Sequence, residues 1–282
     1  MDILLGAHVS VAGGFKNACL NAKATSSNAI QIFTKNQLQW RFKELDPVDV
    51  GLFKNCIAEQ KIKVVSHLSY LVNLGSTDDA ILKNSINAFV DEIKRCDQLN
   101  INLIVFHPGS NKILSEKETI KRIADNLNYI IAVTASFTRI RLVIETTAGQ
   151  GNQIGYKIEQ IAEIIELVED KNKIGVCIDT CHIFSAGYDI INKKSYDKFI
   201  AHFDDVIGLN YLKVIHLNDS LKPIGSKIDR HASIGRGYMG LEAFRLIIND
   251  ERLRGVLFIV ETPGGNSEHK SDIELLRNML VK

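Results

Sequence analysis

Short apolar runs alternate with longer amphipathic stretches along the whole chain. Between the runs, stretches such as DDAILKNSINAFVDEIKRCDQL and YKIEQIAEIIELVED place apolar residues at three- and four-residue spacing, which is typical of amphipathic helices. The final stretch, residues 272–281, is expected to close the series as a helix. The apolar runs have the length of strands and lie at residues 3–8, 29–33, 63–67, 102–107, 141–145, 174–179, 211–216 and 255–261.

This alternation predicts an eight-stranded parallel (β/α)8 TIM barrel, formed as a single domain over residues 1–282. An open, doubly wound sheet is the competing arrangement, but it usually has fewer strands. It would also place a glycine-rich nucleotide fingerprint after the first strand. The stretch GAHVSVAGG has glycines there, but they lack the G-x-G-x-x-G spacing. The barrel is therefore the predicted fold.

Polar, metal-ligating residue types stand at the ends of the predicted strands. In a parallel barrel all carboxyl ends of the strands open on one face, where active sites are built. Helix capping explains an Asp at such a position, but His and Glu are poor N-caps. We therefore predict one site on this face. Runs three to eight end in His67, His107, Glu145, Asp179, His216 and Glu261, and the first run ends in His8.

Converging imidazoles and carboxylates indicate metal chemistry rather than a hydrolytic triad. A triad needs a Ser or Cys nucleophile beside a base, and no predicted strand ends in such a residue. Zn²⁺ takes nitrogen and oxygen ligands. Six donors are too many for one tetrahedral zinc but suffice for two ions that share a carboxylate. Glu145 lies between the other donors in strand order and is the candidate bridge.

A third donor set follows from the loop after the seventh run. Asp229 and His231 are two residues apart, so both can point to one side of an extended segment. Together with His182 they would give a third ion three protein ligands and leave one position open. A D-x-H pair alone is a weak signal, and its place after a metal-bearing strand is what supports the prediction.

The cysteines and the charge add limits. Five scattered cysteines fit free thiols in a reducing cytosol. Cys177 and Cys181 flank Asp179, but C-x-x-x-C is not the spacing of thioredoxin-like motifs. A redox role stays open, whereas burial of Cys177 as a small apolar residue inside the barrel is the preferred interpretation. A net charge of +1 means that any contact with nucleic acid requires a local basic patch.

The start of the chain lacks the pattern of a signal peptide, and no apolar run reaches membrane-spanning length. We therefore expect a cytoplasmic protein with no membrane contact.

Several motifs together closely resemble the endonuclease IV family of apurinic/apyrimidinic endonucleases. They are GVCIDTCH, HLNDSLKPIGSKIDRH followed by ASIGRGYMG, HLSYLVNLGS, and the late VETPGG. GAHVSVAGG and FTKNQLQW fit the same family, so the resemblance runs essentially from end to end. It implies a β/α barrel with three zinc ions that repairs DNA. Such enzymes hydrolyse the phosphodiester 5′ to an abasic site, leave a 3′-hydroxyl and a 5′-deoxyribose phosphate, and remove 3′-blocking groups.

The resemblance also implies a ligand set for each ion. A hydroxide bridging the first two ions would be the nucleophile, since zinc lowers the pKa of bound water. Glu145 and Glu261 are then the candidate catalytic residues, and we hypothesise that Glu261 orients the water. The first ion would be held by His67, His107 and Glu145, the second by Glu145, Asp179, His216 and Glu261, and the third by His182, Asp229 and His231.

Contacts with damaged double-stranded DNA are expected from loops above the rim. Many family members carry Arg where this chain has Leu38, so we expect altered DNA affinity rather than lost activity. His8 is expected to support the ligands or to contact phosphate. By resemblance and charge, Lys35 and Arg41 would meet phosphate, Leu38 or Trp40 would fill the base stack, Tyr70 and Leu71 would enter the helix at the lesion, and Arg230 and Arg236 with Lys222 and Lys227 would form a basic patch.

Two other functions remain open at this point. Sugar isomerases and epimerases of the same barrel superfamily bind one divalent ion through Glu, Asp, His and Glu. Glu145, Asp179, His216 and Glu261 match that set, but an isomerase has no use for the other five donors. A non-catalytic protein that recognises abasic DNA is the alternative from another class. A monomer is expected, because a rim engaged with duplex DNA is difficult to share.

Overall fold

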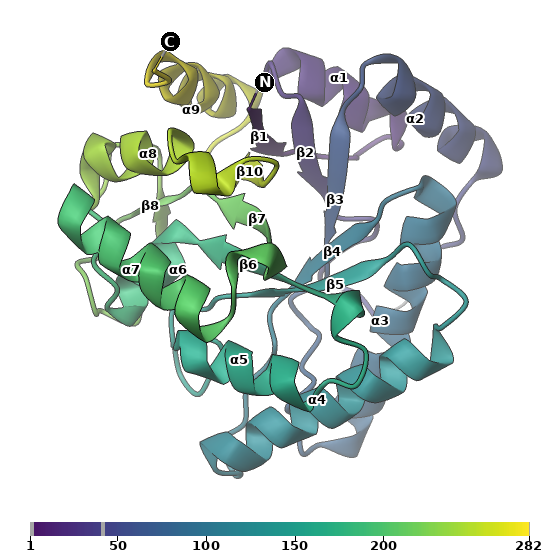
Figure 1. Cartoon of the computed structure of the whole chain (residues 1–282). Helices are drawn as coiled ribbons and strands as arrows, with labels where there is room; N and C mark the ends of the chain where they lie inside the picture. Colours follow the sequence, from purple (N-terminus) through teal and green to yellow (C-terminus); the bar gives the residue numbers. More distant parts are fainter. Residues whose placement is uncertain (1–2, 41–42, 282) are drawn as a thin grey trace.

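The computed structural model describes residues 3–40 and 43–281, so the predicted phosphate contact Arg41 lies outside the described residues. The main element is a closed barrel of parallel strands in the order β1-β10-β7-β6-β5-β4-β3-β2. Helices surround the strands, and α9 lies beside β1, which brings the two chain ends close together (Figure 1). The predicted TIM barrel is confirmed.

The element bounds follow the predicted runs to within two residues for every barrel strand. The strands are β1 (Leu4–His8), β2 (Ala29–Ile32), β3 (Lys63–His67), β4 (Leu103–Phe106), β5 (Arg141–Glu145), β6 (Ile174–Asp179), β7 (Leu212–His216) and β10 (Leu257–Val260). The helices are α1 (Lys16–Ala24), α2 (Pro47–Glu59), α3 (Asp79–Leu99), α4 (Glu116–Val133), α5 (Ile158–Leu167), α6 (Thr180–Ala186), α7 (Lys193–Val206), α8 (Gly240–Ile248) and α9 (Asn266–Asn278).

The last helix begins earlier than the sequence pattern predicts. It spans Asn266–Asn278, whereas apolar spacing predicted residues 272–281. The first turn is polar and is fixed by Glu268, whose carboxylate accepts a hydrogen bond of 2.9 Å from the Gly265 amide. Such capping satisfies an amide that a helix start leaves without a partner, and apolar periodicity cannot detect it.

The barrel interior is filled by apolar side chains below the rim. These are Ala29, Val65, Val105, Val143, Cys177, Val214, Leu257 and Ile259. Cys177 is one of them and is fully buried, as the sequence interpretation expected. A second and larger apolar layer packs the helices against the outside of the sheet. The packed interior leaves the rim as the place where polar strand ends converge.

Two cysteines depart from the expectation of free thiols. Cys19 on α1 and Cys56 on α2 form a disulfide, with Cα atoms 6.4 Å apart. Their separation of 37 residues gave no sign of it, because the pairing depends on how α1 and α2 pack. Cys96, Cys177 and Cys181 are free and buried.

Among the described residues, no helix combines the length and the apolar character needed to cross a membrane.

Candidate metal centre

One buried carboxylate lies at the middle of the rim. Glu145 ends β5 and is 1% exposed. Its Oε2 atom lies 3.0 Å from Nε2 of both His67 and His107. Its Oε1 atom lies 3.0 Å from Nδ1 of His216 and 3.4 Å from Nδ1 of His182. A single carboxylate therefore contacts four imidazoles that come from four different segments of the chain.

All nine predicted ligands come together in the three expected sets. Within each set, one nitrogen or oxygen atom per residue lies within 4.8 Å of the others. Glu145 belongs to two of the sets, as expected of a carboxylate that bridges two ions. The sets are His67, His107 and Glu145; Glu145, Asp179, His216 and Glu261; and His182, Asp229 and His231.

Main-chain carbonyls fix which nitrogen three of these histidines present. Nδ1 of His67 lies 2.8 Å from the carbonyl oxygen of the next residue, and Nδ1 of His182 lies 2.8 Å from that of Thr146. Nδ1 of His231 lies 3.3 Å from the carbonyl oxygen of Glu261. A carbonyl only accepts, so each Nδ1 carries the proton and each Nε2 can serve as the ligand atom.

One orphaned atom tests whether a metal ion fits. Nε2 of His231 is buried and has no hydrogen-bond partner. It faces Oδ1 of Asp229 at 3.3 Å and Oδ2 of Asp179 at 3.5 Å. A nitrogen lone pair held against two carboxylates is unfavourable unless a proton or a cation lies between them. The nitrogen and carboxylate donors of this set fit Zn²⁺.

The electrostatics of the rim favour cations. Burial acts to raise the pKa of Glu145, but the charges of His107 and His216 hold that pKa well below its usual range. Burial acts to lower the pKa of His231, but the carboxylates of Asp179 and Asp229 raise it to about 9. The buried carboxylate of Glu145 thus stays ionised and stabilises whatever positive charge lies beside it.

The nearby thiols are the weaker candidates for metal ligands. Two of them lie close enough to the donor sets to reach an ion. Burial raises the pKa of Cys177 to about 12 and that of Cys181 to about 11. Because the thiolate is the metal ligand, a protonated thiol is a weaker candidate ligand than the imidazoles and carboxylates beside it.

The loop after β7 is held by a residue that sequence reasoning missed. The carboxylate of Asp219 is buried and accepts hydrogen bonds of 3.0 Å from the amides of Gly237 and Met239. A Cβ atom at Gly237 would lie 2.3 Å from the carbonyl oxygen of Ser220, so this approach requires glycine. A short antiparallel pair, β8 (Asp219–Ser220) with β9 (His231–Ala232), then carries His231 to the rim.

Asn218 is a second residue that was missed. Its amide donates a hydrogen bond of 2.7 Å to Oδ2 of Asp179, and its carbonyl accepts one of 2.8 Å from the Glu261 main chain. The other oxygen of Asp179 caps α6 by accepting from the His182 amide at 2.9 Å. The only signal was its place in the HLND motif, two residues after His216.

The predicted DNA-contacting residues fall into an exposed and a partly covered group. The side chains of Leu38 and Tyr70 are 72% and 55% exposed. Arg230 and Arg236 are also exposed, whereas Trp40 and Leu71 are half-buried. The Ser69 hydroxyl donates a hydrogen bond of 2.6 Å to the carbonyl oxygen of Gln37, which connects the loops after β2 and β3.

Lys35 requires a correction. Its side chain is 1% exposed and donates a hydrogen bond of 2.7 Å to the Ala88 carbonyl. Its ammonium also lies 3.4 Å from Oε2 of Glu92 and 3.3 Å from Oδ2 of Asp91, both on α3. An ammonium held this way cannot reach a phosphate, so the predicted phosphate contact was wrong. Lys35 instead anchors the loop after β2 to α3.

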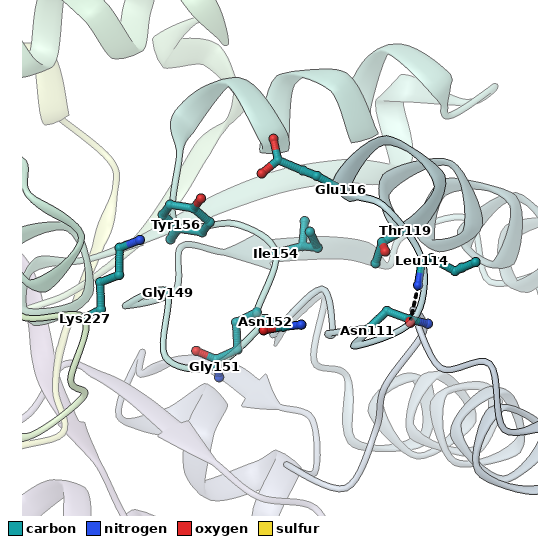
Figure 2. A pocket seen from close by; sticks show the side chains of 11 residues that line it. Asn111, Leu114, Glu116, Thr119, Gly149, Gly151, Asn152, Ile154, Tyr156 and Lys227 are labelled. Atoms are coloured by element: carbon teal, nitrogen blue, oxygen red, sulfur yellow. Dashed lines mark hydrogen bonds between the residues drawn. The ribbon is translucent and has the colours of Figure 1, made fainter.

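A separate cavity of about 220 Å³ lies among the loops that follow β4, β5 and β7. Figure 2 shows Lys227 pointing toward Tyr156 on one side and Asn111 on the other. The Lys227 ammonium lies 4.8 Å from the centre of the Tyr156 ring. None of the nine metal-ligand candidates lines this cavity, so it is distinct from the centre.

Comparisons with known proteins agree with this architecture. Residues 20–279 match a family model described as a xylose isomerase-like TIM barrel. A "Probable endonuclease 4" of Phocaeicola vulgatus is 46% identical over 279 residues, which covers 97% of this chain and 98% of that protein. One of Chlorobium luteolum is 44% identical over 263 residues, covering 92% and 93%.

Solved structures give the same result. Endonuclease IV from Thermus thermophilus superposes with a TM-score of 0.87 at 32% identity, covering 98% of both chains. D-Psicose 3-epimerase from Clostridium cellulolyticum has a TM-score of 0.69 at 16% identity, covering 99% of this chain and all of that one, which reflects the fold alone. The fold and rim thus define a xylose isomerase-like TIM barrel with a candidate metal centre. Within that group, the chain belongs to the endonuclease IV family.

Proposed function

We propose that this protein is a zinc-dependent apurinic/apyrimidinic endonuclease that acts in the cytoplasm as a monomer. Its substrate would be duplex DNA with an abasic site, cut on the 5′ side to leave a 3′-hydroxyl, and it would also clear 3′ blocks. The observation that carries the proposal is Glu145, whose two oxygens contact four imidazoles. This arrangement suits a carboxylate shared by two ions, flanked by a third donor set.

Zinc bound at such a cluster supplies a hydroxide nucleophile near neutral pH and neutralises phosphate charge. The role of the protein is to fix the positions of the ligand atoms and, through hydrogen bonds to the imidazoles, to determine which nitrogen faces the ion. Glu145 joins the first two sets. Glu261 has one oxygen 3.1 Å from Nδ1 of His216 and is placed to orient a water at the second set. His182, Asp229 and His231 would hold the third ion near the leaving oxygen.

The DNA would lie across the rim and the loops above it. Tyr70 would contact the DNA at the lesion directly beside the metal centre. Its ring centroid lies 5.5 Å from that of His67 and 5.9 Å from that of His107. Selectivity for abasic sites then follows from the low cost of extruding a nucleotide that lacks its base. The exposed Arg230 and Arg236 lie on the β7 loop, where phosphate contacts are expected.

The sugar isomerase alternative accounts for less of the site. It would use Glu145, Asp179, His216 and Glu261, which do form one donor set. It gives no role to the five remaining donor residues, among them His231 with its orphaned Nε2. A protein that only binds abasic DNA would bind its substrate without turnover.

The test is incision of a duplex that contains one tetrahydrofuran abasic analogue. The analogue cannot undergo β-elimination, so a cut must be hydrolysis. The expected product is a nick on the 5′ side with a 3′-hydroxyl that a polymerase can extend, formed over many turnovers. An undamaged duplex of the same sequence is the control. An intact damaged duplex in the presence of fully zinc-loaded protein would overturn the proposal.

A further inference from the structure

We propose that Gln31 is a positioning residue that selects the ligand atoms of His216 and Glu261. Gln31 belongs to β2, the one barrel strand for which no residue of the rim site was predicted. Its side chain is fully buried, yet it is polar at both oxygen and nitrogen. Buried amides persist only where they are hydrogen-bonded, and every partner of this one is a rim residue.

The acceptor half of the amide sets the tautomer of His216. Oε1 of Gln31 lies 2.9 Å from Nε2 of His216. The amide oxygen can only accept, so Nε2 carries the proton and Nδ1 becomes the ligand nitrogen. His216 therefore differs from His67, His182 and His231, which present Nε2. It also lies with Nδ1 3.0 Å from Oε1 of Glu145, toward the second donor set.

The donor half of the amide orients Glu261. Nε2 of Gln31 donates a hydrogen bond of 2.5 Å to Oε1 of Glu261 and lies 3.0 Å from Nδ1 of His8. The amide has two hydrogens, one for each of these partners. With Oε1 occupied, the other oxygen of Glu261 is turned to the donor set, 3.1 Å from Nδ1 of His216.

Only a side chain with both a donor and an acceptor can perform this double task. Met and Leu have a similar volume but would leave the ring proton of His216 without a partner. They would also leave Oε1 of Glu261 with only its longer contact, 3.4 Å, to Nδ1 of His8. Removing a hydrogen-bond partner of a metal ligand typically weakens metal binding by about 10- to 100-fold. The inference rests on the proposed function, since it assigns Gln31 to the second ion of the proposed centre.

The test uses Gln31→Met and Gln31→Leu in the full chain, so that the result does not depend on one variant folding. Zinc retained per chain is measured against a rising concentration of a competing chelator, with thermal unfolding recorded for the stripped and loaded proteins. Tyr196→Phe is the matched control. It removes one part-buried hydrogen bond, 2.7 Å to Asp250 Oδ2, on an outer helix.

We expect the Gln31 variants to lose one zinc ion at a chelator concentration about 10- to 100-fold lower than wild type, while the control follows wild type. Incision should lose kcat with little change in KM for the damaged duplex. Equal zinc retention with a lower unfolding temperature would mean a merely structural role and would overturn the inference. A wild-type protein that retains no zinc would overturn the proposed function instead.

Discussion

Nδ1 of His216 lies 3.0 Å from Oε1 of Glu145, although the two residues are 71 positions apart in the sequence. The contact exists because β5, β6 and β7 are successive neighbours in a parallel barrel. The opposite oxygen of Glu145 faces His67 and His107 at 3.0 Å. Each oxygen of one carboxylate is thereby assigned to a different donor set.

Replacing Glu145 with Gln should remove this bridge while keeping its shape. An amide carries no charge and cannot hold two cations, so we expect loss of the first two ions and a fall in kcat of more than about 100-fold. Zinc analysis and incision kinetics check this. The matched control is Glu166→Gln, which changes a carboxylate on the surface of α5. Full zinc content in the Glu145 variant would show that the carboxylate is not shared.

Replacing His231 with Ala should affect only the third donor set. The variant loses the orphaned Nε2 but leaves Glu145 and its other partners in place. We therefore expect one zinc ion fewer per chain and a lower kcat, with the affinity for damaged duplex retained. Metal analysis combined with binding to uncut duplex measures both quantities. An unchanged zinc content would place His231 outside the centre.

Replacing Lys35 with Met should lower the free energy of unfolding rather than the affinity for DNA. The change leaves the buried carboxylate of Glu92 without its ion-pair partner, which costs about 3 kcal/mol. Urea denaturation measures this effect.

Lys227→Met is the matched comparison, because this lysine is exposed beside the rim. It should lower the free energy of unfolding by no more than about 1 kcal/mol, because it removes only the contact with the Tyr156 ring. It should also reduce the salt dependence of DNA binding by about one unit of slope. If Lys35→Met shows the salt effect and keeps its stability, the internal role of Lys35 is wrong.

The free thiols should resist alkylation in the folded protein. Burial raises the pKa of Cys177 to about 12 and that of Cys181 to about 11, so almost no thiolate is present at pH 8. Because the thiolate is the reactive form, labelling should appear only as the chain unfolds. Mass spectrometry after iodoacetamide treatment, with and without denaturant, reads this directly. Rapid labelling of either residue at pH 8 without denaturant would indicate an accessible and reactive thiol.

The sequence predicted the barrel and the residues of its donor sets for a physical reason. Short apolar runs indicate buried parallel strands, and the amphipathic stretches of period 3.6 between them indicate the connecting helices. The geometry of a barrel then brings the strand ends together. His67 and Glu145 could be assigned in this way without knowing any distance.

Residues whose role depends on packing could not be predicted. Gln31 appeared to be one polar position in an apolar run, and only the register of β2 beside β1 brings it to His8. Lys35 appeared to be a surface charge, but α3 covers it. The Cys19–Cys56 disulfide depends on the contact between two helices, and sequence spacing carries no information about it.

The central claim is that the rim hydrolyses DNA with zinc held by these residues. The most direct measurement is the incision rate of the tetrahydrofuran duplex as zinc is titrated into the stripped protein. The account predicts no incision without metal and a rate that reaches its maximum near three zinc ions per chain. Incision that is equally fast in the stripped protein, or absent when all donor sets are loaded, would contradict it.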